Sequence, residues 1–550
     1  MATTKHQHRL FAVFAFCLLC FSLLCTACSG SSTSAPAKPA TQEDQDTSRF
    51  IVAIEEEPDT VDFQRTSIHY TIATNVFDRL VEMKTDSSGA VVPTPSLAES
   101  WEESNDGKTY TFHLREGVTF SNGSALTASD VLYSFTRLLT HPDSCNQDIA
   151  EIIQGADALE AGSTDELTGF HIVDDLTFTI TLEQPFEAFL ACLSMPGASI
   201  LDEQTVAEAN DLFGMDAEHT IGTGPFVIKE WVPGKHIQLE ANAHCWSGRP
   251  QSEGVNLLFV PDTEKIRSMF EKGQLDILDL DDQGNAAEFF IHGDIYQSRI
   301  QSVPQIGITY IALNESMAPL DDVRVRKALQ LSLDRETLLD VVYSGRGSVE
   351  NGIFSRGLYG FNPNLPQIPY DVEQARKLLK EAGFSDGFDL TFSVKNSSTQ
   401  WEMTLAEHVV QMWNDVGINA TLEVLDESEW MSLRKSGKLS CYTATWTADY
   451  DDPDNYIYTF FGNTANTTYR SLCYPNEDVM RRVRGARTIT DSNKRIKEYY
   501  ELEKTIVQDD AAWIPLFSRE RLYVTSERLS GFQHAWNGSV KNVYREMSIE

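Results

Sequence analysis

Apolar and polar residues alternate with two different periods along most of the chain, so the sequence predicts both strands and helices. From Lys108 to Arg115, and again from Leu176 to Leu182, apolar side chains occupy every second position. This period is typical of a strand with one buried face. Two shorter apolar runs, at 50–54 and 308–313, predict further strands.

Helix signals stand between these strands. Thr127 and Asp130 resemble a capping box at the start of an amphipathic helix. Asp371 begins a second helix, whose apolar residues recur at helical spacing. A longer amphipathic helical region is predicted over 321–343. The alternation of strands and helices from 49 to 550 predicts a body of the mixed α/β class.

The first 27 residues have the pattern of an export signal. Basic residues and no acid precede Leu10–Leu24, in which Ser22 is the one polar residue. This apolar segment is shorter than the roughly 20 residues that span a membrane as a helix, so a signal peptide is favoured over a transmembrane anchor. The small residues before Cys28 resemble the lipobox of bacterial lipoproteins, whose cysteine becomes the first mature residue and carries a diacylglycerol. Plain secretion after ordinary cleavage is the alternative.

Residues 28–48 lack large apolar side chains and predict a flexible, lipid-anchored tether. As a coil, such a segment spans on the order of 25 Å. We therefore expect a protein attached to the cell membrane by lipid, facing outside the cytoplasm at the extracellular face or in the periplasm.

Composition excludes several classes of function. The 550 residues carry 44 basic and 81 acidic side chains, a formal charge of −37. Nucleic-acid binding depends on basic side chains that neutralise phosphates, so we expect no nucleic-acid partner. Hydrophobic residues make up 41%, as in ordinary globular proteins, and the length predicts two to four domains. We expect a monomer.

No catalytic or metal-binding signature is present. The sequence contains no His-Glu-x-x-His, Gly-x-Ser-x-Gly, P-loop or Gly-x-Gly-x-x-Gly motif. The predictions are therefore no enzyme, no metal and no cofactor, with a hydrolase assembled in space as the remaining enzymatic alternative. The five cysteines outside the N-terminal region are odd in number and lack metal-ligand spacing. They are Cys145, Cys192, Cys245, Cys441 and Cys473.

The C-terminal half of the chain contains an acidic cluster. Asp449, Asp451, Asp452 and Asp454 lie within six positions, but Pro453 breaks the pattern of a calcium loop. Asp451 and Asp454 are expected to be solvated loop charges.

Several segments, taken in order, resemble the solute-binding proteins of bacterial oligopeptide and dipeptide ABC importers, known as solute-binding family 5. Each segment alone is a weak pattern, but in this order they indicate a resemblance from about Arg49 to the C-terminus. The segments are 57–62, 77–81, 97–101, 110–115, 120–123, 222–226, 322–329, 333–335, 375–384 and 446–450.

The resemblance implies a two-lobed periplasmic-binding-protein-like fold, with a ligand enclosed between two α/β lobes that close about a hinge. A subdomain is inserted into the first lobe. The expected parts are lobe I at 49–78, 205–304 and 518–550, its inserted subdomain at 79–204, and lobe II at 305–517. The strands at 306–313 and 513–517 are the expected hinge crossings.

The resemblance also implies a ligand site. Trp446-Thr447-Ala448-Asp449-Tyr450 is similar to the family's Trp-x-Ala-Asp-Tyr segment, whose aspartate pairs with a peptide's N-terminal ammonium in peptide-binding members. Asp449, flanked by Trp446 and Tyr450, is therefore expected to bind the ligand, because a buried ammonium needs a carboxylate. Glu57 is expected to add a contact from lobe I, and Thr223 to border the site.

Each of these residues could also have a purely structural role, without binding a ligand. In the structural alternative, the segment 446–461 would form hydrophobic core beside an exposed acidic loop, with no ligand contact. Glu57 would be a solvated surface charge, and Thr223 would only stabilise the geometry of its turn. Thr443 stands where some oligopeptide-binding members carry an arginine near the ligand's C-terminus, which removes one partner for a carboxylate.

The function implied by the resemblance is peptide transport. A lipoprotein would capture peptides and deliver them to ABC transporter permease subunits with their ATPase. Two alternatives stay open. The same fold binds nickel chelates, haem or oligosaccharides in relatives, and a surface receptor or adhesin would use it outside import. The context of Asp449 favours peptides.

Overall fold

The computed structural model describes residues 48–66, 70–87, 91–538 and 544–550. The expected signal peptide, Cys28 and all but the last residue of the tether lie outside these ranges. The fold described below is that of the part of the chain that begins at residue 48.

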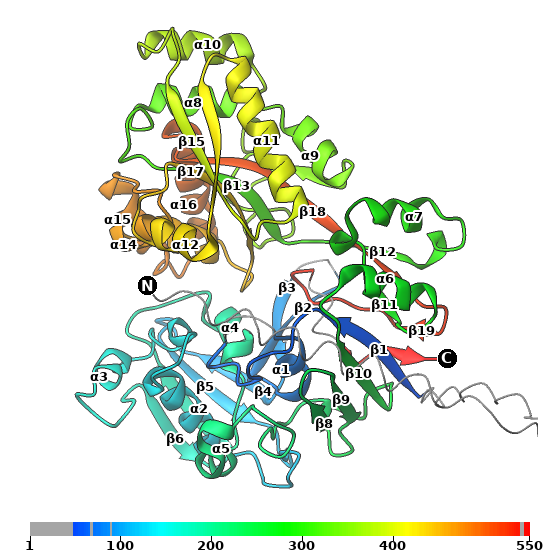
Figure 1. Cartoon of the computed structure of the whole chain (residues 1–550). Coiled ribbons are helices and arrows are strands. Elements are labelled where there is room, and N and C mark those ends of the chain that lie inside the picture. The colour runs from blue at the N-terminus through cyan, green and yellow to red at the C-terminus, as the bar shows by residue number, and fades with distance from the viewer. Residues whose placement is uncertain (1–47, 67–69, 88–90, 539–543) are drawn as a thin grey trace, which may run out of the picture. The chain divides into compact units, whose positions relative to one another are not determined.

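A twelve-stranded mixed sheet runs through the body (Figure 1). Its path is β16-β15-β17-β13-β18-β11-β1-β10-β9-β8, and β12 and β14 also pair with β18. The bounds are β1 Arg49–Ile54, β8 Phe226–Val232, β9 His236–Ala241, β10 Gly254–Phe259, β11 Ile277–Asp279, β12 Ile300–Pro304, β13 Gly307–Leu313, β14 Gly347–Val349, β15 Asp389–Lys395, β16 Asn419–Leu425, β17 Cys441–Thr447 and β18 Trp513–Thr525.

Strand β18 joins two halves of this sheet. Its first part, Trp513–Phe517, pairs with β13, and its second part, Glu520–Val524, pairs with β12. We call the half built on β13 to β17 lobe II and the half built on β1 and β8 to β12 lobe I. The chain therefore passes between the halves at 304–307 and at 517–520, next to the expected hinge strands. The position of the hinge and the exact lobe boundaries stay predictions.

A separate four-stranded antiparallel sheet, in the order β4-β5-β7-β6, belongs to the inserted part of lobe I. Its core includes Tyr110, Phe112 and Leu114 on one face of β5 and also takes in Tyr450 of lobe II, so the alternating pattern in β5 correctly predicted a half-buried strand. The bounds are β4 Ala98–Glu103, β5 Thr109–Leu114, β6 Phe170–Asp174 and β7 Thr177–Thr181, with the hairpin β2 Val81–Thr85 and β3 Val91–Pro95 beside it.

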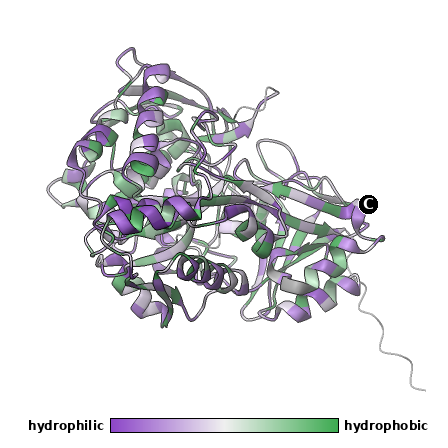
Figure 2. Cartoon of the chain, turned by 90° about the horizontal axis from the view of Figure 1, so that it is seen from above, coloured by the Kyte–Doolittle hydropathy of each residue, from purple (hydrophilic) through white to green (hydrophobic). Residues whose placement is uncertain are grey.

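Helices cover both lobes, and Figure 2 shows purple hydrophilic and green hydrophobic residues along the same helices, as amphipathic helices require. Those of lobe I and its insertion are α1 Tyr70–Val76, α2 Ala128–Thr140, α3 Ala156–Glu160, α4 Phe189–Cys192, α5 Glu203–Ala209, α6 Thr263–Glu271 and α7 Ala287–His292. Those of lobe II are α8 Val323–Leu331, α9 Arg335–Tyr343, α10 Val372–Glu381, α11 Gln400–Asp415, α12 Glu427–Lys435, α13 Asp454–Phe461, α14 Thr464–Tyr469, α15 Glu477–Ala486 and α16 Ser492–Lys504.

The predicted helix starts are confirmed, but one predicted length is wrong. Thr127 and Asp130 form the capping box of α2, and the Asp371 side chain accepts a hydrogen bond from the backbone N–H of Gln374 at the start of α10. The long helix expected over 321–343 is two helices, α8 and α9. They separate because Asp334 caps α9 through the backbone N–H of Thr337, 3.2 Å away.

Two findings bear on the chain's surroundings. All five cysteines of the body are free thiols, so no disulfide restrains the lobes. Within the ranges described, no helix combines the length and the apolar character that crossing a membrane requires.

Candidate ligand-binding site

A cavity of about 700 Å³ contains Asp449 together with residues of lobe I and its inserted part. This volume falls within the usual range for small-molecule sites. Asp78, just after α1, and Arg115, just after β5, line the cavity, as does Trp246 from the loop after β9. Asp449 is the residue of lobe II in its wall.

The position of Asp449 is fixed by Asn455, a buried residue of α13. The Asn455 side-chain amide donates to Asp449 Oδ2 at 3.2 Å, and its oxygen accepts from the Asp449 backbone N–H at 3.1 Å. The same oxygen accepts from Nε1 of Trp446, also at 3.1 Å. One amide of α13 therefore binds the end of β17 and both the backbone and the side chain of Asp449. Sequence analysis missed Asn455, because a polar residue in the first turn of a helix is usually read as a capping or surface residue.

Asp449 is a carboxylate without a cationic partner. Among the described residues, no lysine or arginine nitrogen lies within 4.0 Å of it, and its side chain reaches solvent through the cavity. The surrounding protein withdraws water, and this raises the pKa of Asp449 to about 6, although the Asn455 hydrogen bond opposes the rise. The negative charge of Asp148 adds to it, and the positive charge of Arg470 opposes it. Such a group gains from a cationic ligand.

The two aromatic residues beside Asp449 do not line the cavity. Trp446 packs edge to face on Phe460, with ring centroids 5.3 Å apart, and the Arg470 guanidinium lies 5.2 Å from the Trp446 ring. Tyr450 is buried in the core of the inserted part of lobe I and donates a hydrogen bond to Asp454 at 3.1 Å. These side chains therefore support the loop, and ligand contact by either one stays a prediction.

Thr223 does not line the cavity itself but binds Asp78, which does. Its turn packs so closely on the end of α1 that a Cβ on Gly222 would lie 2.2 Å from the backbone oxygen of Val76. Thr223 is buried, and its hydroxyl donates to Asp78 Oδ2 at 3.1 Å. The Trp246 indole donates to the same oxygen at 2.7 Å. Burial raises the pKa of Asp78, and these two hydrogen bonds oppose the rise.

Glu57 is neither in the cavity nor simply solvated. It is half-buried, and its carboxylate accepts from Nε1 of Trp231 and from the backbone N–H of Gly234, both at 2.7 Å. The structure thus does not bring Glu57 to Asp449, and a ligand contact by Glu57 would require it to leave these partners.

The expectation that Asp451 and Asp454 are solvated is wrong, and Asp452 between them is buried as well. Asp451, Asp452 and Asp454 are at most 5% exposed. Both oxygens of Asp452 accept from Arg495 at 2.7 Å, and Asp454 lies 3.2 Å from Nε of Arg487. Asp451 accepts from the backbone N–H of Tyr359 at 2.7 Å, and burial raises the pKa of Asp451 to about 7. The cluster is structural and holds the Asp449 loop in place.

The helices α15 and α16 of lobe II, which hold the Asp449 loop, also contact the inserted part of lobe I at their ends. The Arg487 guanidinium lies 3.8 Å from the ring centre of Tyr458 and 4.7 Å from that of Phe186, which belongs to the inserted part. Nearby, the Ser492 hydroxyl donates to Glu187 at 2.8 Å. Lobe II therefore touches the insertion beside the carboxylate that faces the cavity.

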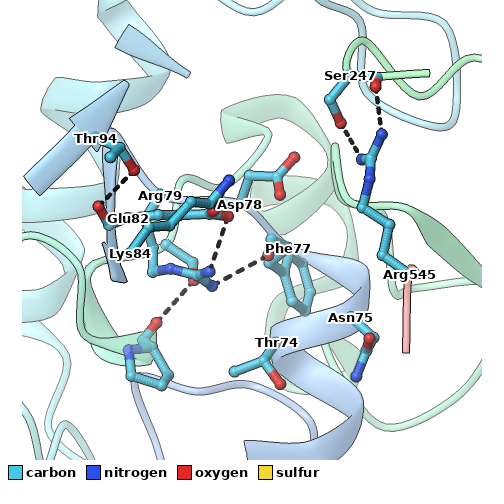
Figure 3. Close-up of polar contacts among 12 residues, drawn as sticks. Thr74, Asn75, Phe77, Asp78, Arg79, Glu82, Lys84, Thr94, Ser247 and Arg545 are labelled. Carbon is cyan, nitrogen blue, oxygen red and sulfur yellow. Dashed lines mark hydrogen bonds and ion pairs between the residues drawn. The ribbon is translucent and has the colours of Figure 1, made fainter. Parts of the chain in front are cut away.

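Most other charges of the cavity wall are paired (Figure 3). Arg79 and Lys84 both lie near Glu82, at 3.4 and 3.2 Å, and Arg545 lies 3.3 Å from Glu546 while donating to Ser247. Burial raises the pKa of Glu82, but the two cations beside it lower that pKa below its ordinary value. Across the described part of the chain, no three His, Cys, Asp or Glu side chains gather as metal ligands do.

Comparison with known proteins gives this arrangement a context. The dipeptide-binding protein of Escherichia coli (strain K12) is 29% identical over 452 residues, which cover 79% of this chain and 82% of that protein. Heme-binding protein A of Haemophilus influenzae is 29% identical over 473 residues, which cover 83% and 84%.

Solved structures share the fold. The periplasmic binding protein DppA from Helicobacter pylori, in complex with the peptide STSA, has a TM-score of 0.73 and 23% identity over 92% of this chain and 99% of its own. CtaP from Listeria monocytogenes has a TM-score of 0.77 and 21% identity over 91% and 99%. The expected two-lobed α/β fold is thereby confirmed.

A protein-family model identifies the family of this chain. The model described as bacterial extracellular solute-binding proteins, family 5, middle part, matches residues 92–468, well over half of the chain. The members are solute-binding proteins of ABC importers rather than enzymes. The chain belongs to the bacterial extracellular solute-binding proteins of family 5.

Proposed function

We propose that this protein captures short peptides outside the cytoplasm and delivers them to an ABC permease for import. The observation that carries the proposal is Asp449, a carboxylate held by Asn455 in the wall of a cavity of about 700 Å³, with no lysine or arginine nitrogen of the described ranges within 4.0 Å. A peptide's N-terminal ammonium is a cation of the right size, and pairing would compensate for the water that both charges lose.

The names of relatives support peptides over other solutes. Dipeptide-binding and di/tripeptide-binding proteins from Escherichia coli and Pseudomonas aeruginosa align over 79% or more of the chain. One relative is named for haem, so haem is the second candidate ligand.

Capture would use the two lobes. We propose that 49–78, 205–304 and 518–550 form lobe I, with 79–204 inserted, and that 305–517 form lobe II, which closes on the peptide about the two crossings of the sheet. The closed, monomeric protein would then dock on the permease, whose ATPase drives import. Trp446, Tyr450 and Thr223 would act by supporting the site, and Glu57 by a contact made after closure.

Mass spectrometry of solutes released from the purified mature protein tests this function. The expected result is a mixture of peptides with free N-termini. If the released solute is haem, a metal chelate or an oligosaccharide, the protein does not bind peptides as proposed.

We further propose that lipid on Cys28 anchors the protein. Cys28→Ser is expected to abolish incorporation of radiolabelled palmitate and to release the protein from membranes, because a serine at this position has no sulfur to carry the diacylglycerol. Cys25→Ser is the matched control and should keep the label. Equal label in wild type and Cys28→Ser would contradict the lipid site.

Peptide affinity is expected to fall about tenfold as the pH drops from 7 to 5. Asp449 has a pKa of about 6, so below that pH it is protonated and cannot pair with an ammonium. Affinity should also fall above pH 8, since a peptide α-amino group has a pKa of about 7.7–8.0. Calorimetric titrations at pH 5 to 9 measure both limbs.

Asp449→Asn is the control for the acid limb of this profile. It removes the titrating group and keeps the shape, so its weaker binding should vary little between pH 7 and 5. An equally steep fall in that variant would assign the acid limb to another group near the loop, such as Asp148 or Asp451, both of which have raised pKa values.

A further inference from the structure

Of the four arginine and lysine residues that line the cavity in the described part of the chain, Arg115 is the one without a carboxylate partner. It lines the cavity that contains Asp449 and also a neighbouring cavity of about 740 Å³. Among the described residues, no carboxylate oxygen lies within 4.0 Å of its guanidinium, whereas Arg79, Lys84 and Arg545 of the same wall each have one.

The guanidinium is nevertheless held firmly. Its Nε donates to the backbone oxygen of Ser96 at 2.6 Å, and its centre lies 4.8 Å from the ring of Trp246. Trp246 is fixed in turn by its hydrogen bond to Asp78, which also accepts from Thr223. The stacked ring and the Nε bond together set the plane of the guanidinium.

This anchoring leaves the outer edge of the guanidinium unused. Within the described part of the chain, its two terminal nitrogens have no hydrogen-bond acceptor, and Nε makes the single hydrogen bond of the group. Glu99 and Glu116 line the neighbouring cavity, but both are exposed to water. A planar fork with two free nitrogens matches the two oxygens of a carboxylate.

We infer that Arg115 binds the C-terminal carboxylate of the ligand, so that the cavity selects short peptides with both termini free; the inference rests on the function proposed above. Asp449 would bind the positive end of such a zwitterion and Arg115 the negative end, from opposite lobes. Thr443 cannot serve the carboxylate, because it is a neutral residue within β17 whose hydroxyl donates to the backbone oxygen of Tyr310 at 3.1 Å.

Trialanine and its C-terminal amide, compared by calorimetry, test the assignment. In the wild type the amide is expected to bind about 10- to 100-fold more weakly, the range for loss of a hydrogen-bonded charge. In Arg115→Gln, the free acid should bind as weakly as the amide. The ratio of the Kd of the amide to the Kd of the free acid is then about one. Lys84→Gln is the matched control, since Lys84 is an exposed cation of the same wall that is already paired, and it should keep the wild-type ratio.

The outcomes separate this assignment from the proposed function. If free acid and amide bind the wild type equally well, Arg115 is not the carboxylate partner, although peptide capture stands. If neither binds, the proposed function fails and this assignment with it. Should Arg115→Gln not fold, Arg115→Lys decides. Lysine keeps the charge without the fork, so a lower ratio than wild type supports the assignment and an equal ratio overturns it.

Discussion

Asp449→Ala is expected to raise the Kd for a short peptide by about two to four decades. Removing one partner of an ion pair that the closed lobes exclude from water costs about 3–5 kcal/mol, and each 1.4 kcal/mol is tenfold in affinity. In this variant the Asn455 amide, which holds Asp449 in the wild type, would remain beside the bound ammonium. This amide is neutral, and among the described residues it binds no other carboxylate that could replace Asp449. Calorimetric titration with trialanine measures the change.

The control must be an aspartate that the structure shows to be solvated. Asp451 and Asp454 are buried and bound, so replacing them would disturb the loop itself. Asp478 on α15 is 65% exposed and pairs with the exposed Arg481, so Asp478→Ala should leave the Kd unchanged. A Kd for Asp449→Ala within about threefold of the Asp478→Ala value would remove Asp449 from the site.

Asp452→Ala is expected to lower the free energy of unfolding of lobe II by about 3–5 kcal/mol. Asp452 is 3% exposed and Arg495 is fully buried, and the pair makes two hydrogen bonds of 2.7 Å. Without Asp452 the buried guanidinium loses the carboxylate that binds it through two hydrogen bonds and keeps only the charge of Asp454, which already lies 3.2 Å from Arg487; losing one partner is the costly case for a buried ion pair. Urea unfolding followed by tryptophan fluorescence measures the loss.

Two further variants test the cause of that loss. Asp452→Leu combined with Arg495→Met removes both charges and should recover most of the stability, because no buried charge is left without a partner. Asp478→Ala, which breaks an exposed pair, should cost at most about 1 kcal/mol. If Asp452→Ala unfolds at the same urea concentration as Asp478→Ala, the pair contributes little.

Local sequence patterns predicted the framework of the fold well. The period-two runs became β5 and β7, and the caps at Thr127 and Asp371 begin α2 and α10. These features depend on residues within a few positions of one another. The break between α8 and α9 was missed, because the apolar spacing continues past Asp334, and only the cap geometry shows that a new helix begins there.

The candidate site was predictable in part. Asp449 was found through a resemblance, and it lies in the cavity wall. Its acidic neighbours were misjudged because their partners, Arg487 and Arg495, lie more than 30 residues away in the sequence. Charge clusters are usually solvated, and only the tertiary packing of α13 against α15 and α16 shows that this one is not.

The remaining site residues depend on contacts that no spacing reveals. Thr223 acts on Asp78, 145 positions earlier, and Glu57 is bound to the turn after β8. Arg115 belongs to a half-buried strand end, where an arginine is ordinary. Its unpaired edge becomes visible only when Trp246 and the cavity are in place.

The most direct test of the central claim is a calorimetric comparison of trialanine with N-acetyl-trialanine on the wild-type protein at pH 7. Acetylation removes the ammonium and leaves Asp449 without a partner, so we predict that the acetylated peptide binds at least about 100-fold more weakly. The same comparison on Asp449→Ala should show little difference, because both changes delete one interaction. Equal affinity of the two peptides for the wild type would contradict peptide capture through Asp449.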